Sequence, residues 1–209
     1  YNSFMLDQGV QYEQLKESDL VVDQIYHTGP GVGKAGEPIA KLMPGAPNSS
    51  GFRISGGGAV GKVEHRRVKY AALHSTGKNN DWPDFIDNTF GRFTYFGDNK
   101  KPGRELHSTQ RRGNLFLRNI FEDLHSGNRI AIPPCFVFIS TGHKHDVQFK
   151  GLAIPGVEDI GANGDLLAIW RTKDNQRFQN YKALFTILDV PVIDRKWIKD
   201  LAAADDLYP

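Results

Sequence analysis

The spacing of apolar residues predicts two helices in this chain. The clearest helix lies at 111–125, where apolar residues recur at i, i+3, i+4 and i+7 and form one stripe: Leu117, Ile120, Phe121 and Leu124. Gly127 follows in the position of a C-terminal cap. A second helix is expected in the segment RKWIKDLAAA, which Asp194 precedes as an N-cap.

Strands are expected along most of the remaining chain. Runs rich in β-branched and aromatic residues predict strands at 19–26, 67–75, 92–98, 135–140, 147–154, 165–172 and 178–190. The segment 27–61 is rich in Gly, Pro and Ser, and 79–88 is a polar loop with one Trp. Because strands and helices do not alternate regularly, the pattern favours an α+β fold with a curved, mostly antiparallel sheet or partial barrel and flanking helices.

Length and composition fit one soluble domain that spans residues 1–209. No linker or internal repeat divides the chain, and no apolar run is long enough to span a membrane. The first residues show no signal-peptide pattern. The single cysteine, Cys135, lies in an apolar strand and suits a reducing compartment, so we expect a buried thiol and a cytoplasmic protein.

Charge is distributed unevenly along the chain, although the net charge is only +2. The net charge is −4 for residues 1–26, +8 for 27–118 and −2 for 119–209. A basic middle between acidic flanks is typical of proteins that bind a polyanion, because Lys and Arg that meet phosphates release condensed counterions. Nucleic acid is therefore a candidate partner.

Three motifs resemble catalytic or cofactor sites, and each lacks an essential part. The segment TGPGVGKA (28–35) has the glycines and Lys of a phosphate-binding loop, but it lacks the first Gly and the hydroxyl residue, and Pro38 interrupts the helix that should follow. The segment HKHD (143–146) lacks further metal ligands at a set spacing. Asp146 and Lys150 hold only fragments of a magnesium-dependent nuclease motif, on one strand. We expect no catalytic residue, metal or cofactor.

The segment 92–118 is the most informative stretch of the chain. It carries seven basic residues and two acids, with Arg111 and Arg112 at the start of the expected helix. A helix N-terminus already favours phosphate through its free N–H groups and dipole, whereas cations there do little for the helix itself. These two arginines are therefore candidate DNA contacts.

Trp82, Tyr95 and Asp98 supply the parts of a pocket for an extruded base. A protein that inspects one base must lift it out of the stack, hold it between aromatic faces and bind its Watson–Crick edge. Cytosine presents an N4 amino donor there, for which a carboxylate is the natural acceptor. Each residue also fits a structural role, as a core Trp, a strand Tyr and a turn Asp.

Several long strings resemble the N-terminal domain of the AspBHI group of restriction endonucleases, which are modification-dependent enzymes of the MspJI type. The strings are DWPD, GRFTYFGDNKKPGRELHSTQRRGN, NSSGFR and RTKDNQRFQNYKALFTILDVP, and the resemblance runs from about residue 14 to about 200. It implies an SRA-like domain of a bacterial enzyme that flips 5-methylcytosine from duplex DNA. It also implies a separate C-terminal nuclease domain, which we expect to be absent from this chain.

The resemblance extends the set of candidate residues. In the base pocket, Asn99 joins Trp82, Tyr95 and Asp98. Arg53 and Asn48 are expected to probe a groove, because Arg can bind a guanine bidentately. Phosphate or base contacts are expected from a wider group: Lys41, Arg92, Lys100, Lys101, Arg104, His107, Arg111, Arg112, Asn114, Gln179 and Asn180.

Three hypotheses stay open at this point. The chain is a binder of duplex DNA that contains modified cytosine, a metal-dependent nuclease, or a DNA-binding module that ignores modification. The preferred modification, the flanking sequence and the oligomeric state do not follow from the sequence.

Overall fold

Nine strands form one sheet in the computed structural model, which describes residues 9–47, 51–56 and 68–204. The main path of the sheet runs through β3 (Arg53–Gly56), β4 (Val68–Ser75), β7 (Cys135–Ser140), β8 (Val147–Pro155), β10 (Gln176–Ile187), β6 (Arg92–Phe96) and β5 (Phe85–Asp87). Of the two other strands, β2 (Ile25–Tyr26) pairs with β8 and β9 (Leu166–Lys173) pairs with β10. Among the strands of the described residues, only β4 and β7 pair in parallel. The expected α+β class and mostly antiparallel sheet are confirmed, but the sheet is not closed into a barrel.

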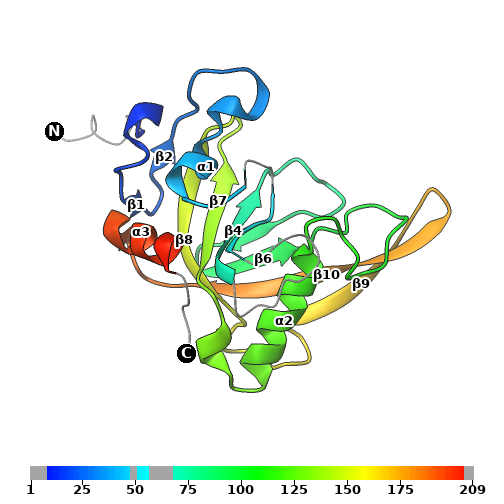
Figure 1. Cartoon of the computed structure of the whole chain (residues 1–209). Helices are drawn as coiled ribbons and strands as arrows, with labels where there is room; N and C mark the ends of the chain where they lie inside the picture. The colour runs from blue at the N-terminus through cyan, green and yellow to red at the C-terminus, as the bar shows by residue number, and fades with distance from the viewer. Residues whose placement is uncertain (1–8, 48–50, 57–67, 205–209) are drawn as a thin grey trace.

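Helices cover both faces of this sheet (Figure 1). The longest, α2 (Gly113–His125), lies on one face, and α1 (Pro38–Leu42) and α3 (Arg195–Ala203) lie on the other. A small second sheet pairs β1 (Leu20–Val21) with β11 (Val192–Ile193). Three 3-10 turns, η1 (Tyr12–Gln14), η2 (Gly33–Gly36) and η4 (Arg129–Ala131), complete the described elements. No helix in the described part of the chain is long and apolar enough to cross a membrane.

Two separate hydrophobic cores follow from the alternation of side chains along the central strands. In β4, Ala71 and Leu73 belong to the core under α2, whereas Tyr70 and Ala72 belong to the core under α1 and α3. Successive residues of a strand point to opposite faces, so a strand covered on both sides must be apolar at nearly every position. This explains why the middle of β4 (70–73) and most of β7 (135–139) are continuous apolar runs in the sequence.

The chain departs from the expected elements where turn geometry interrupts an apolar run. The expected strand at 19–26 is two short strands, because Asp23 has a positive φ of 66° and turns the chain between them. Within the Gly- and Pro-rich segment, α1 forms with Pro38 at its start and the Glu37 side chain accepting from Ala40 N at 3.0 Å. A short strand, β5, lies in the segment expected to be a loop.

A buried ion pair ties β3 to the start of α1. The Arg53 guanidinium donates to both carboxylate oxygens of Glu37 at 2.8 Å, and the two side chains are 0% and 6% exposed. The structure therefore corrects the expectation for Arg53, which lies inside the protein and not on a groove-probing surface. Asn48, expected beside it, lies outside the described residues.

We predict that Arg53→Ala lowers the free energy of unfolding by about 3–5 kcal/mol, because removing one partner leaves a buried carboxylate without its counter-ion. Urea denaturation measures the change. The control is Lys196→Ala, which breaks an exposed ion pair with Asp200 and should leave the denaturation midpoint unchanged. A loss for Arg53→Ala no larger than that of the control would contradict the structural role given to the pair.

Candidate nucleic-acid interface

The turn after β6 brings Asp98 to the N-terminus of α2. Gly113 N and Asn114 N donate to the two oxygens of the Asp98 carboxylate at 3.0 and 2.9 Å. The residue before the helix, Arg112, has a left-handed φ of 54° and its side chain does not cap the helix. Asp98 therefore satisfies N–H groups that the helix leaves free, and its negative charge lies at the positive end of the helix dipole.

Three buried asparagines hold the turn at 97–99 in place from inside the protein. Asn180, on β10, accepts from Asn99 N at 3.2 Å and from Asn114 Nδ2 at 3.0 Å, and its own Nδ2 donates to the carbonyl of Gly97 at 3.0 Å. All three asparagines are at most 2% exposed. A Cβ on Gly97 would lie 1.7 Å from Asn114 Oδ1, so this turn requires glycine. The asparagines hold the interface in shape and are not themselves surface contacts.

A cavity of about 350 Å³ opens beside this turn. Tyr95 and Asp98, predicted together from the sequence, both line it. Three basic side chains also line it: Lys100, Arg104 and Arg111. The remaining lining residues are Gly51, Phe52, His74, Thr76, Asn79 and Gln110. The volume is in the range of small-ligand sites, and its charge suits an anionic ligand.

Burial keeps two of the lining groups uncharged near neutral pH. Burial lowers the pKa of His74 to about 4, and the positive charge of Arg53 acts in the same direction. His74 Nε2 is 3.0 Å from Ser140 Oγ, and its Nδ1 has no hydrogen-bond partner among the described residues. Burial raises the pKa of the Tyr95 hydroxyl well above its usual value, and the nearby carboxylates of Asp84 and Asp98 add to this effect. Tyr95 therefore keeps its proton.

Trp82 does not line this cavity, which corrects the expected sandwich of Trp82 and Tyr95. Its ring is 1% exposed and packs against Phe96 and Phe178, with centroid distances of 5.5 and 6.0 Å. The Arg171 guanidinium lies 4.6 Å from the ring centroid. Trp82 thus anchors its own loop, between β4 and β5, to the protein interior, which is the structural role that a core Trp usually has.

The basic residues expected to contact DNA divide into two groups. Lys101 and Arg112 lie on the same loop and helix start as the three basic residues of the cavity. Others are committed elsewhere: Lys41 lies over the Tyr12 ring, Arg92 is 3.7 Å from Asp159 at the far end of β6, and His107 is 2.8 Å from the Tyr181 hydroxyl. For Gln179, the structure shows its backbone carbonyl accepting from Asn99.

Sequence reasoning missed several lining residues because they lie in segments with another evident role. His74 lies near the end of β4, and its only signal in the sequence is a polar residue that directly follows the apolar run 70–73. Asn79 lies in the polar loop, where its side chain accepts from Asp81 N and Trp82 N at 3.1 Å. Asp84 lines a neighbouring cavity of about 330 Å³, and burial raises its pKa above the usual value.

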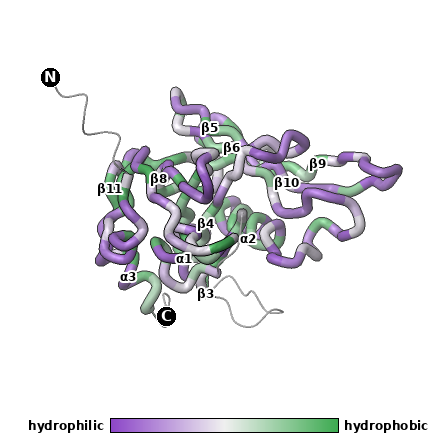
Figure 2. The backbone as a smooth tube through the Cα atoms, turned by 90° about the horizontal axis from the view of Figure 1, so that it is seen from above, coloured by the Kyte–Doolittle hydropathy of each residue, from purple (hydrophilic) through white to green (hydrophobic). Residues whose placement is uncertain are grey.

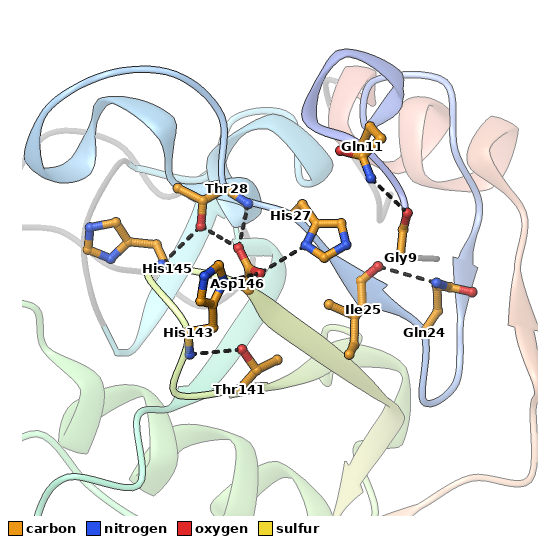
Figure 3. A network of polar contacts seen from close by, with 10 residues as sticks. All are labelled: Gly9, Gln11, Gln24, Ile25, His27, Thr28, Thr141, His143, His145 and Asp146. Atoms are coloured by element: carbon orange, nitrogen blue, oxygen red, sulfur yellow. Dashed lines mark hydrogen bonds and ion pairs between the residues drawn. The ribbon is translucent and has the colours of Figure 1, made fainter. Parts of the chain in front are cut away.

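The HKHD motif forms a polar cluster around Asp146 (Figure 3). The Asp146 carboxylate lies 2.9 Å from His27 Nδ1 and 3.0 Å from His143 Nδ1, and it accepts from Thr28 N and Thr28 Oγ1. Burial alone would raise the pKa of Asp146, but these hydrogen bonds lower it well below its usual range. The cluster anchors the phosphate-loop look-alike, which begins at Thr28, to the turn between β7 and β8.

The two residues of the nuclease-like motif, Asp146 and Lys150, pair with other side chains of the fold. The Lys150 ammonium pairs with Asp23, and Asp146 is engaged as described above. In the described residues, no group of three or more His, Cys, Asp or Glu side chains is arranged to hold a metal ion.

Comparison with solved structures finds the same fold in restriction enzymes. The "DNA recognition domain of the cytosine modification-dependent restriction endonuclease LpnPI" shares 38% identity with a TM-score of 0.85, over 94% of this chain and 86% of that chain. The "DNA modification-dependent restriction endonuclease AspBHI" shares 39% identity with a TM-score of 0.83, over 97% of this chain and 51% of that one. An MspJI–oligonucleotide complex has a TM-score of 0.61 at 19% identity, over 91% of this chain and 49% of that one, which shows the fold alone.

The sequence comparisons give the family. A search of curated proteins found no significant match. The family model described as "Restriction endonuclease AspBHI N-terminal" matches residues 20–208, which include the turn at 97–99, α2 and β10. The chain therefore belongs to the AspBHI N-terminal family, the DNA-recognition domains of modification-dependent restriction endonucleases.

Proposed function

We propose that this chain binds double-stranded DNA containing modified cytosine, with 5-methylcytosine preferred, and that it flips the modified base into the cavity beside Tyr95 and Asp98. The observation that carries the proposal is a cavity with neutral polar groups and one carboxylate inside a basic surround. A base inside a duplex exposes only its groove edges, so a protein that surrounds the whole base must extrude it, and a cavity of this kind supports that mode of binding. The similarity to the recognition domain of LpnPI, a cytosine modification-dependent restriction endonuclease, supports the choice of base.

The lining groups match the hydrogen-bonding edge of cytosine. Tyr95, which keeps its proton, can donate to a ring nitrogen or carbonyl oxygen. Asp98 uses one lone pair of each oxygen for the helix N-terminus, which leaves acceptor capacity for the N4 amino group. The Phe52 ring, also in the lining, offers an apolar surface for a 5-methyl group. Because Asp98 also caps α2, its removal would mix pocket and helix effects, so Tyr95 is the better test position.

Cleavage is assigned in this proposal to a nuclease domain or partner and not to these residues. The chain spans about half the length of the AspBHI chain that it matches. In our proposal, its own task is targeting: the cavity selects the base, and the basic residues position the duplex.

We predict that Tyr95→Phe reduces the preference for a 5-methylcytosine duplex over a plain duplex about fivefold, because in this proposal only the methylated base enters the cavity, where one neutral hydrogen bond contributes about 1 kcal/mol. Competition titrations with matched duplexes measure the preference. Tyr181→Phe is the matched control, since its hydroxyl contacts His107 and does not line the cavity. An equal preference in the Tyr95→Phe variant and the wild type would rule out this role for the hydroxyl.

We predict that Lys100→Gln weakens binding to methylated and plain duplexes by the same factor, because a phosphate contact carries no base information. The slope of log K against log salt should fall by about 0.9, the value for one phosphate neutralised. Lys199→Gln, on α3, controls for the change in net charge. A selective loss of the methylated duplex would instead place Lys100 at the base.

We predict that His74 makes the folded protein progressively less stable as the pH falls from 6.5 to 4. Its pKa is about 4 in the folded protein and 6.5 when free, so in this window the unfolded chain binds a proton that the folded chain does not. Falling pH therefore lowers the free energy of unfolding, by about 3 kcal/mol across the window. Urea denaturation across this range should show a shallower pH dependence for His74→Gln. The same pH dependence in both proteins would contradict a neutral buried imidazole.

A further inference from the structure

A two-stranded arm extends beyond the body of the sheet. β10 pairs with β9 from Gln176 to Ala183 but with β6 only from Lys182 to Thr186. Among the described strands, residues 168–173 and 176–181 therefore form a ladder only with each other, and we call them the arm. Figure 1 shows the arm projecting from the sheet on the side opposite α3, and Figure 2 shows the same separation from above, with mostly hydrophilic residues along the arm.

Local geometry keeps the arm extended. Asp174 and Asn175 form a two-residue turn with φ values of 52° and 60°, the left-handed pair that matches the twist of a hairpin. An isolated hairpin is only marginally stable in water. Here Phe178 packs on Trp82, and Asn180 joins the buried asparagine cluster, so the base of the arm is fixed to the same turn that shapes the cavity.

The arm carries an excess of exposed positive charge. Its strands hold Arg171, Lys173 and Arg177, all exposed, and the turn between them adds one acid, Asp174. The Arg177 guanidinium lies 4.6 Å from the centroid of Trp170, which is 54% exposed. Stacking on a ring restricts a guanidinium without using its N–H donors, so Arg177 is held in place with its donors available to a ligand.

The arm lies next to the mouth of the base cavity. Lys173 lines a shallow hollow of about 440 Å³ together with residues of the loop after β4, and its ammonium is 3.3 Å from Asp81. Thr76, Asn79 and Lys100 line both this hollow and the base cavity. A duplex placed with its target base in the cavity therefore has the arm beside it.

We propose that the arm is a second DNA-contact element that follows the sugar–phosphate backbone on one side of the target base, with Lys173 and Arg177 binding phosphates. The inference rests on the proposed function for the placement of the duplex. At about 3.3 Å per residue, the part of β10 beyond β6, residues 176–181, is about 20 Å long. At 3.4 Å per nucleotide of one strand, it spans about six base pairs.

The test compares a double variant, Lys173→Gln with Arg177→Gln, against wild type on two duplexes. One duplex extends at least ten base pairs on each side of a central 5-methylcytosine. The other is a closed hairpin with only three base pairs on each side of the 5-methylcytosine. Arg171 is left intact because it stacks on Trp82. The control is Lys196→Gln with Lys199→Gln on α3, which removes the same charge at the opposite end of the molecule in both views.

We expect the arm variant to lower the salt slope on the long duplex by about 1.8, the value for two phosphates, and to bind the short duplex like the control. Its preference for methylated over plain DNA should stay at the wild-type value, because the cavity is unchanged. Equal losses on both duplexes, or a slope equal to that of the control, would overturn the proposal. DNA-free wild-type dimers that the arm variant abolishes would assign the arm to chain–chain contact and also overturn it.

The two proposals fail in different ways. If wild type binds methylated and plain duplexes equally, the base-flipping function fails, while the difference between long and short duplexes still tests the arm. If wild type prefers the methylated duplex and the arm variant matches the control, only the arm proposal fails.

Discussion

The hydrogen bonding of one short turn, residues 97–99, determines where the other parts of the interface lie. Its backbone groups are satisfied by Asn114 from α2 and by Asn180 from β10, while Asp98 binds the free N–H groups of the helix. Buried polar groups are stable only when paired, so the helix, the strand and the turn must keep one relative arrangement. Tyr95 and Lys100, on either side of this turn, line the cavity because of that arrangement.

The same turn links the cavity to the arm. Asn180 and Phe178 lie on the strand that continues into the arm, and Phe178 packs on Trp82, which belongs to the loop at the cavity mouth. Residues that sequence analysis assigns to base contact, such as Trp82 and Asn99, are therefore supports for the contact surface. Both side chains are buried, and in the proposed function the exposed cations around them bind phosphates.

Local patterns in the sequence account for most of the fold. Apolar spacing predicts α2 and α3 nearly to the residue, and continuous apolar runs predict the strands that are covered on both faces. The site is harder to predict because its contacts are distant in sequence. Asp98 caps a helix fifteen residues ahead, and Asn114 and Asn180 are 66 residues apart. Arg53 illustrates the same limit, since nothing near it in the sequence announces its pairing with Glu37.

The most direct test of the account is a binding titration of the chain with two duplexes that differ only in one 5-methyl group, near physiological salt. The account predicts at least a roughly tenfold preference for the methylated duplex, which corresponds to about 1.4 kcal/mol of binding free energy. Equal affinity for the two duplexes would contradict it and would leave the cavity without a role in selecting the base.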